Sequence, residues 1–172
     1  MKPTSEILER MYRNPEEHSD GIYTRLYRYL LREDIYMTAY KNLYANKGAG
    51  TEGVDNDTAD GFGKEYVSQI IDGLKNLAYE PKAVKRVYIP KRNGKMRPLG
   101  IPSFRDKLVQ DALRQILEAV YEPVFSAHSH GFRPNRSCHT ALKEISRSFR
   151  STKWFVEGDI KGCFYNIDHA YL

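Results

Sequence analysis

The 172-residue sequence has little cysteine and no long apolar run, and each shortage excludes a class of protein. Its two cysteines, Cys138 and Cys163, are too few for a disulfide scaffold and favour a reduced, cytoplasmic protein. No stretch approaches the roughly 18 apolar residues of a membrane-spanning helix, so we expect no membrane partner. The opening MKPTSEILER also lacks the apolar core of a signal peptide. The 41% of hydrophobic residues is ordinary for a folded domain.

Acidic side chains are scarce in the second half of the chain. Residues 1–80 carry 10 basic and 14 acidic side chains, whereas residues 81–172 carry 17 basic and 8 acidic ones. The stretch 81–105 has no acidic residue and eight basic ones: Lys82, Lys85, Arg86, Lys91, Arg92, Lys95, Arg97 and Arg105. Such a block indicates either a polyanionic partner or a solvated basic face, and charge alone favours neither.

Apolar periodicity predicts helices over about 22–31, 34–46, 62–77, 104–122 and 136–149. The segment 46–63 holds five glycines and is predicted to be a loop. Ser103 and Asp106 have the spacing of a capping box at the start of the helix over 104–122. The sequence therefore predicts a chain made mostly of helices.

The period changes over 84–101. Two extended runs, 84–89 and 96–101, flank Asn93-Gly94, a strong hairpin signal because both residues tolerate positive φ. Three cations then lie at or near the hairpin tip: Lys91, Arg92 and Lys95. A tip has few duties in the core, so this placement favours a binding role for the basic block.

A last strand is predicted over 154–160, and Asp159 lies at its end. A carboxylate beside a basic surface suits Mg²⁺, which at phosphoryl-transfer sites takes one or two carboxylates together with substrate phosphates. The alternative is a turn or capping residue, since the chain has no adjacent pair of aspartates. Asp168 is predicted to cap a helix that has hardly begun at Leu172, so the last structural unit is expected to be incomplete.

Zinc is a weaker alternative. The residue types of a zinc site occur at His128, His130, Cys138 and His139, but their spacing is irregular.

Four blocks in the chain resemble, in the family's own order, the group II intron-encoded reverse transcriptases, also called maturases. Residues 158–169, GDIKGCFYNIDH, resemble the first catalytic motif. Residues 46–55, NKGAGTEGVD, resemble the loop ahead of the fingers, and residues 86–102, RVYIPKRNGKMRPLGIP, resemble the fingers hairpin. Residues 131–139, GFRPNRSCH, resemble the next block. The resemblance covers roughly residues 34–172.

The resemblance implies an α+β fold, with helix-rich reverse transcriptase fingers, a β-hairpin and the first strand of the palm. It divides the chain into an N-terminal helical region with the pre-fingers loop (1–80), fingers (81–150) and an incomplete start of the palm (151–172). It also implies that the Ala-Asp-Asp motif lies beyond Leu172. We therefore expect the chain by itself not to extend a primer.

The resemblance assigns roles to single residues. Asp159 would be the catalytic, Mg²⁺-binding aspartate, and the Ile160 carbonyl would add a ligand. Lys91 and Arg97 would clamp the incoming triphosphate, and Phe164 would favour deoxynucleotides by clashing with a ribose 2′-hydroxyl.

Further residues would touch nucleic acid. Gly100, Ile101 and Pro102 would lie against the template, where a residue without a side chain allows close approach. Phosphate contacts are expected at Lys85, Arg86, Arg92, Lys95 and Arg105, with a solvated face as the alternative. Residue 165 departs from the family pattern, because Tyr165 stands where an aspartate is usual.

The resemblance implies an RNA-directed DNA polymerase of a retroelement that binds its intron RNA, assists RNA splicing and copies RNA into DNA. Its partners would be intron RNA, an RNA template with a DNA primer, and dNTPs. A retron or diversity-generating reverse transcriptase is the related alternative, and an RNA-binding module without catalysis is the alternative from another class. A homodimer is left open. Helical spacing favours internal packing over stacking on RNA for the tyrosines of the N-terminal half: Tyr23, Tyr27, Tyr29, Tyr36, Tyr40 and Tyr44.

Overall fold

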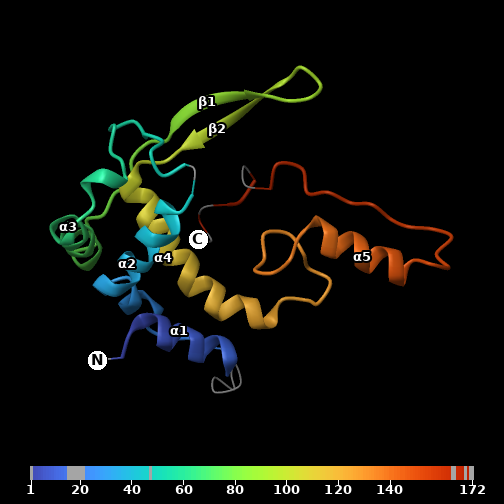
Figure 1. Ribbon diagram of the computed structural model, residues 1–172, viewed down its shortest axis with the longest axis horizontal. Coiled ribbons are helices and arrows are strands. Elements are labelled where there is room, and N and C mark those ends of the chain that lie inside the picture. Colours follow the sequence, from blue (N-terminus) through green and yellow to red (C-terminus); the bar gives the residue numbers. More distant parts are fainter. Residues whose placement is uncertain (1, 15–21, 47, 164–165, 169, 171–172) are drawn as a thin grey trace. The chain divides into compact units, whose positions relative to one another are not determined.

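The computed structural model describes residues 2–14, 22–46, 48–163, 166–168 and 170 (Figure 1). The chain divides into two compact units, Met1–Phe125 and Ser126–Leu172. No helix in the described part of the chain is both long enough and apolar enough to cross a membrane.

The first unit is a small helical body. Its α-helices are α1 (Thr4–Arg13), α2 (Glu33–Tyr44), α3 (Lys64–Lys75) and α4 (Phe104–Tyr121). Short 3₁₀ turns connect or extend them: η2 (Leu26–Tyr29), η3 (Ala59–Gly61) and η4 (Glu122–Val124). The helices predicted over 34–46, 62–77 and 104–122 are thus confirmed with adjusted ends.

Helix α4 is the centre of this body, because it packs against both α1 and α2. Its buried side chains repeat at helical spacing, from Phe104 and Leu108 through Ala112 to Ile116. Tyr36 of α2 is fully buried, and its hydroxyl donates to the Leu30 carbonyl at 2.8 Å. This pairing satisfies two polar groups that would otherwise be costly to bury.

The N-terminal tyrosines divide into two groups. Tyr29 and Tyr36 are buried, and the Tyr40 ring stacks on Phe62 with centroids 4.0 Å apart, so the expectation of packing is confirmed for these. Tyr44 is largely exposed. Tyr23 is half-buried against the core, whereas Tyr27 is partly exposed and its hydroxyl donates to the Leu74 carbonyl at 2.8 Å. The predicted packing is thus confirmed for Tyr23, Tyr29, Tyr36 and Tyr40.

The hairpin is the sheet of the first unit. Strands β1 (Lys85–Pro90) and β2 (Met96–Ile101) pair antiparallel, with Lys85 opposite Ile101 and Pro90 opposite Met96. The predicted hairpin is confirmed. Its turn differs in detail, because only Gly94 has positive φ, at 77°. Asn93 contributes instead through its side chain, which accepts a hydrogen bond from the Lys95 amide at 3.2 Å.

One prediction about the first unit is wrong, and the end of one confirmed helix differs from its prediction. The helix expected over 22–31 is only the 3₁₀ turn η2, because Arg25 before it lies in the left-handed region at φ 61°. The helix expected to reach Leu77 ends at Lys75, and Leu77 is 84% exposed with φ at 54°. Helix α1 was not predicted at all. Its buried residues are Thr4, Leu8 and Met11, so the buried face combines two apolar side chains with one polar one.

The second unit contains helix α5 (Cys138–Ser148). Ser137 caps it, and a capping box joins Ser137 to Thr140, as hydroxyl and backbone groups bond in both directions. The strand predicted over 154–160 is wrong, since those residues form no strand and are exposed. A strand needs a neighbour to pair with, and no described segment pairs with this one. Asp168 accepts from the Ala170 amide at 2.9 Å, as an N-cap does.

The described helices and the two-stranded antiparallel sheet confirm the α+β class. The division into 1–80, 81–150 and 151–172 stays a prediction.

Candidate nucleotide and nucleic-acid interface

The β-hairpin projects from the helical body of the first unit and carries most of the basic block (Figure 1). The tip is closed by the Lys91 amide, which donates to the Lys95 carbonyl at 2.8 Å, and by the Gly94 amide, which donates to the Lys91 carbonyl at 3.0 Å. These bonds fix the backbone between the strands. The side chains at the tip are therefore held on a short, ordered turn.

A concavity of about 530 Å³ lies at this tip. Its lining combines three cations with apolar side chains: Ile89, Pro90, Lys91, Arg92, Asn93, Arg97 and Leu99. Ile89 pairs directly with Arg97 across the ladder, so their side chains share one face of the hairpin. The structure thus brings both predicted clamp residues, Lys91 and Arg97, to one site.

The cations of this hairpin have no acidic partner in the described part of the chain. Six of them are exposed, and none makes an ion pair with a described residue: Lys85, Arg86, Lys91, Arg92, Lys95 and Arg97. Lys82 differs, because its ammonium pairs with Asp55 at 2.8 Å. Six uncompensated charges on one projecting element make a site suited to a polyanion.

Arg105 is placed differently from the other predicted phosphate contacts. It is half-buried in the first turn of α4, and its Nε is buried without a hydrogen-bond partner among the described residues. Burial raises the pKa values of Tyr66 and Tyr79, and the positive charge of Arg105 opposes both rises. The side chain therefore acts electrostatically on the interior of the body, and its phosphate contact stays a prediction.

The predicted template contacts lie at the base of β2. Gly100 is opposite Arg86, and Ile101 and Pro102 are half-buried. A Cβ added to Gly100 would lie 2.8 Å from Cγ2 of Val84, so a glycine lets the chain before β1 approach closely.

Asp159 and Ile160 lie in the second unit on an exposed stretch without regular structure. A turn follows them, in which the Asn166 side chain donates to the Lys161 carbonyl at 3.0 Å and Gly162 adopts φ of 62°. Phe164, the predicted nucleotide gate, and Tyr165 lie outside the described residues. The roles of Asp159, Ile160 and Phe164 stay predictions.

The residues present fit Mg²⁺ in type. The Asp159 carboxylate and the Ile160 carbonyl offer the hard oxygen donors that Mg²⁺ prefers, and both residues are exposed. No group of three or more histidine, cysteine or acidic side chains gathers as a metal site in the described part of the chain. The pair would therefore be part of a ligand set, to which phosphates and water also contribute.

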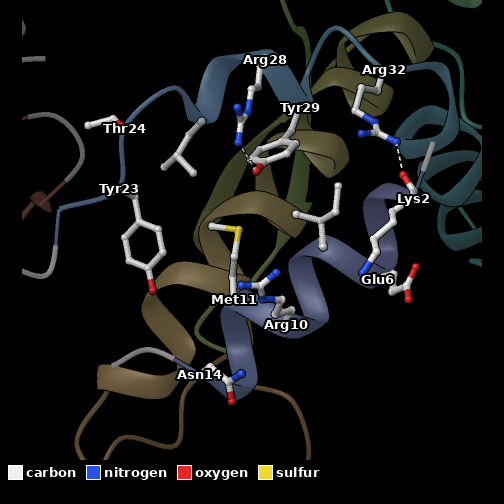
Figure 2. Close-up of a pocket in the computed structure, with 12 residues that line it drawn as sticks. Lys2, Glu6, Arg10, Met11, Asn14, Tyr23, Thr24, Arg28, Tyr29 and Arg32 are labelled. Atoms are coloured by element: carbon white, nitrogen blue, oxygen red, sulfur yellow. Dashed lines mark hydrogen bonds between the residues drawn. The ribbon is translucent and has the colours of Figure 1, made fainter. Parts of the chain in front are cut away.

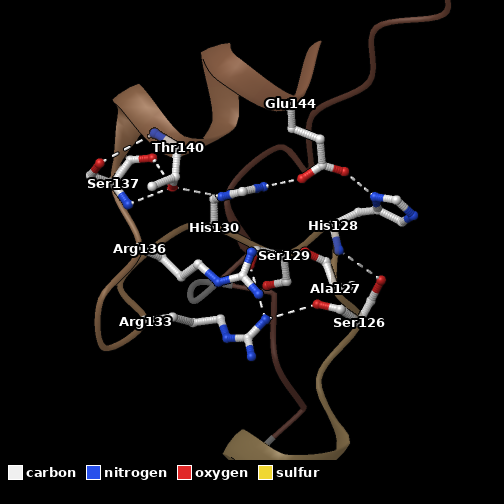
Figure 3. Close-up of polar contacts among 10 residues, drawn as sticks. All are labelled: Ser126, Ala127, His128, Ser129, His130, Arg133, Arg136, Ser137, Thr140 and Glu144. Carbon is white, nitrogen blue, oxygen red and sulfur yellow. Dashed lines mark hydrogen bonds and ion pairs between the residues drawn. The ribbon is translucent and has the colours of Figure 1, made fainter. Parts of the chain in front are cut away.

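The zinc alternative finds no support in the polar cluster of the second unit (Figure 3). Glu144 of α5 bridges the two histidines, bonding His130 Nε2 at 2.6 Å and His128 Nδ1. His130 Nδ1 also lies 2.8 Å from the Thr140 hydroxyl. The hydrogen bonds from His128, followed by those from His130, lower the pKa of Glu144. Histidines and carboxylate thus satisfy one another.

Two arginines complete this cluster by binding backbone. Arg133 donates to the carbonyls of Ser126 and Ser129 at 2.8 and 2.9 Å. Arg136 donates to the Ala127 carbonyl at 3.0 Å. The GFRPNRS block therefore folds its own loop against the start of α5, a role that its charge alone did not reveal.

Sequence reasoning also missed a pocket of about 690 Å³ between α1 and the η2 segment (Figure 2). Two of the arginines that line this pocket are bound to neighbouring residues of the first unit. Arg28 donates to the Tyr29 hydroxyl at 2.9 Å and lies over its ring, and Arg32 donates to the Lys2 carbonyl at 2.5 Å. Residues 1–32 carry six basic and five acidic side chains, so the charge of this segment did not indicate a pocket. The hairpin remains the more open cationic site.

Comparison with known proteins identifies the class first. A family model described as Reverse transcriptase (RNA-dependent DNA polymerase) matches residues 89–172. That range includes β2 and the Asp159 stretch.

Individual relatives then narrow the class. The group II intron-encoded protein LtrA of Lactococcus lactis subsp. cremoris is 63% identical over 173 residues, covering 100% of this chain and 29% of the relative. An uncharacterized 91 kDa protein in the cob intron of Schizosaccharomyces pombe is 47% identical, covering 84% of this chain and 18% of the relative. Nuclear intron maturase 1 of Arabidopsis thaliana is 40% identical over 67 residues, 39% of this chain and 9% of the relative.

The chain belongs to the group II intron-encoded reverse transcriptases, or maturases. It spans less than a third of the length of the Lactococcus relative, 29%.

Proposed function

We propose that this chain supplies the nucleotide- and template-binding fingers, and one Mg²⁺ ligand, of an RNA-directed DNA polymerase that acts on a group II intron. Family membership supports the polymerase. One structural observation supports the nucleotide site. Lys91, Arg92 and Arg97 line one concavity at an ordered hairpin tip, with no carboxylate partner among the described residues.

The chemistry of these side chains suits a triphosphate. Arg97 offers a planar fork that binds two phosphate oxygens at once, and Lys91 offers a mobile point charge. Ile89 and Leu99 line the same concavity with apolar surface. Such surface excludes water and strengthens the charge–phosphate attraction. The hairpin tip would hold the phosphates of an incoming dNTP, and Phe164 would select its sugar.

Asp159 and the Ile160 carbonyl would hold Mg²⁺. When bound, the ion supplies charge neutralisation for the phosphates. The contribution of this chain is to present two oxygen donors on an exposed stretch.

The remaining cations of the hairpin would bind nucleic-acid backbone. Lys85, Arg86 and Lys95 are exposed along its length, and Arg92 adds to them at the tip. Phosphate contacts of this kind position a template–primer without reading its sequence. Gly100, Ile101 and Pro102, at the hairpin base, would lie along the template.

At the level of the whole protein, the proposed partners are intron RNA, an RNA template with a DNA primer, and dNTPs. The proposed roles are RNA splicing and copying of RNA into DNA in the cytoplasm. A homodimer would be compatible with the exposed apolar side chains of α5, which has no buried residue. Membership of the intron family favours these roles over those of a retron or diversity-generating enzyme.

The second candidate is an RNA-binding module without catalysis. One observation favours it: no group of three or more acidic, histidine or cysteine side chains that could hold a metal ion forms in the described part of the chain. A chain of this kind would bind RNA with a steep salt dependence and incorporate no nucleotide.

The test is the affinity of the chain for a dNTP in the presence of Mg²⁺, measured by competition with a fluorescent dNTP. Arg97→Ala is expected to weaken binding about tenfold or more, because a charge-assisted bidentate contact contributes about 1.5–3 kcal/mol. Arg13→Ala is the matched control, since Arg13 is an exposed arginine in α1 of the same unit, where it pairs with Glu9. Equal affinity of Arg97→Ala and wild type would refute the nucleotide clamp.

A further inference from the structure

A buried aspartate lies where the hairpin joins the helical body. Asp106 is 4% exposed in the first turn of α4. Its backbone amide donates to the Ser103 hydroxyl, which caps α4. Its carboxylate accepts three hydrogen bonds: from the Tyr79 hydroxyl at 2.5 Å, the Lys82 amide at 3.0 Å and the Ser103 hydroxyl at 2.8 Å. A buried carboxylate is stable only when it is bonded in this way.

The three donors come from both ends of the hairpin. Tyr79 and Lys82 precede β1, and Ser103 follows β2. One carboxylate on a rigid helix therefore holds the incoming and the outgoing chain together. Figure 1 shows the two strands converging at this end of α4. The direction in which the hairpin leaves the body is set at this junction.

The loop ahead of α3 braces the same junction from another side. A Cβ added to Gly53 would lie 2.7 Å from the Ser103 Cα, so the loop backbone runs directly against the residue that caps α4. Lys107 donates to the Thr51 carbonyl at 2.7 Å, and Lys82 pairs with Asp55 at 2.8 Å. These contacts leave the hairpin base little freedom to pivot.

The Tyr79 hydroxyl remains a hydrogen-bond donor over the physiological pH range. Burial, followed by the hydrogen bond to Asp106, raises the pKa of Tyr79 well above its ordinary value. The phenol therefore stays protonated and remains a donor.

We propose that Asp106 is a positioning residue for nucleotide binding: by joining Tyr79, Lys82 and Ser103 it fixes the angle of the hairpin, and so the place of Lys91 and Arg97. The part of this inference that concerns nucleotide rests on the proposed function. The part that concerns the hairpin angle does not.

The hairpin angle is measured by the distance between two spin labels. The labels are attached at Met96→Cys in β2 and Gln110→Cys in α4, with Cys138→Ser and Cys163→Ser removing the exposed native thiols. Double electron–electron resonance then compares the labelled protein with Asp106→Asn, Asp106→Ala and Tyr79→Phe. Asp72→Asn is the matched control, because Asp72 is an exposed aspartate in α3 of the same unit.

The wild type and Asp72→Asn are expected to give one narrow distance distribution. Asp106→Ala is expected to broaden it most, Asp106→Asn less because one oxygen acceptor remains, and Tyr79→Phe least because it removes one donor of three. Far-UV circular dichroism identifies variants that keep their helices. If the folded variants, including Tyr79→Phe, give the wild-type distribution, Asp106 does not fix the hairpin and the inference is overturned.

A second measurement, of dNTP affinity, distinguishes failure of this inference from failure of the proposed function. Affinity for a dNTP with Mg²⁺ is expected to fall several-fold in Asp106→Asn and to be unchanged in Asp72→Asn. Broadened distances in a protein whose wild type binds no dNTP would support the hairpin junction and refute the nucleotide clamp. Broadened distances with unchanged dNTP affinity would overturn the positioning role.

Discussion

Asp106 shows at the scale of one residue how a local signal can hide a larger role. Its spacing from Ser103 predicted a capping box, and the Ser103 hydroxyl does accept from the Asp106 amide at 3.2 Å. The carboxylate, however, bonds Tyr79 and Lys82 as well. Those residues are 27 and 24 positions away, and a capping pattern carries no information about such partners.

Other residues of the site were within reach of sequence reasoning. Lys91 and Arg97 were placed on the hairpin by the Asn-Gly turn, and their roles came from the family resemblance. The placement of Arg105 was not within reach of sequence reasoning. Its position in the basic block implied exposure, whereas its place in the first turn of α4 makes it half-buried. Charge in a sequence does not tell which way a side chain points.

Gly53 provides a test at the same scale. A Cβ at this position would lie 2.7 Å from Ser103 Cα and 2.9 Å from Ser103 N, both backbone atoms. Gly53→Ala is therefore expected to lower the free energy of unfolding by about 1–3 kcal/mol, because the backbone must shift to admit the methyl group. Urea denaturation measures the change.

Gly50→Ala is the control, because nothing lies within 4 Å of a Cβ there. It is expected to leave stability unchanged or slightly raised. Equal effects of the two substitutions would show that the loop does not press against the start of α4.

At the scale of the element, strong local sequence patterns predicted the hairpin and α4. The elements that were predicted wrongly or missed depend on contacts with distant residues. The hairpin and α4 followed from a turn dipeptide and a long apolar period. Helix α1 was missed because its docking depends on a distant partner: the Thr4 amide and hydroxyl donate to Asp34 at 2.5 and 2.6 Å. The 154–160 segment has strand-like composition, but composition supplies no pairing partner.

Glu144 gives a prediction for the loop before α5. Its pKa is lowered by hydrogen bonds from His128 and then His130, so the folded form favours the carboxylate. The resulting stabilisation is present above the ordinary pKa of 4.5 and is lost as pH falls through the lowered folded value. The wild type is thus expected to unfold at a higher temperature than Glu144→Gln at about pH 6, and this difference is expected to shrink as the pH falls below 4.5.

Thermal unfolding by circular dichroism across this pH range measures the difference. Glu157→Gln is the control, because Glu157 is an exposed glutamate of the same unit. A gap between wild type and Glu144→Gln that stays constant with pH would contradict the histidine–glutamate contact.

At the scale of the whole molecule, charge is distributed by element. The acidic excess of residues 1–80 is absorbed partly by contacts inside the body, such as Asp55 with Lys82 and Asp34 with Thr4. Burial raises the pKa of Asp34, but the hydrogen bonds from Thr4 and Arg32 outweigh it and hold the pKa below its ordinary value. The hairpin cations have no such contacts among the described residues, so the basic excess remains available to a ligand.

These hairpin cations are proposed to bind the phosphates of nucleic acid and nucleotide. The most direct measurement is the affinity of the chain for an RNA template–DNA primer duplex over a series of salt concentrations. Wild type is compared with a triple variant, Lys91→Ala with Arg92→Ala and Arg97→Ala. The slope of log affinity against log salt is predicted to become shallower by about one for each phosphate that the variant no longer binds. An unchanged slope in the triple variant would show that these three cations do not contact phosphates.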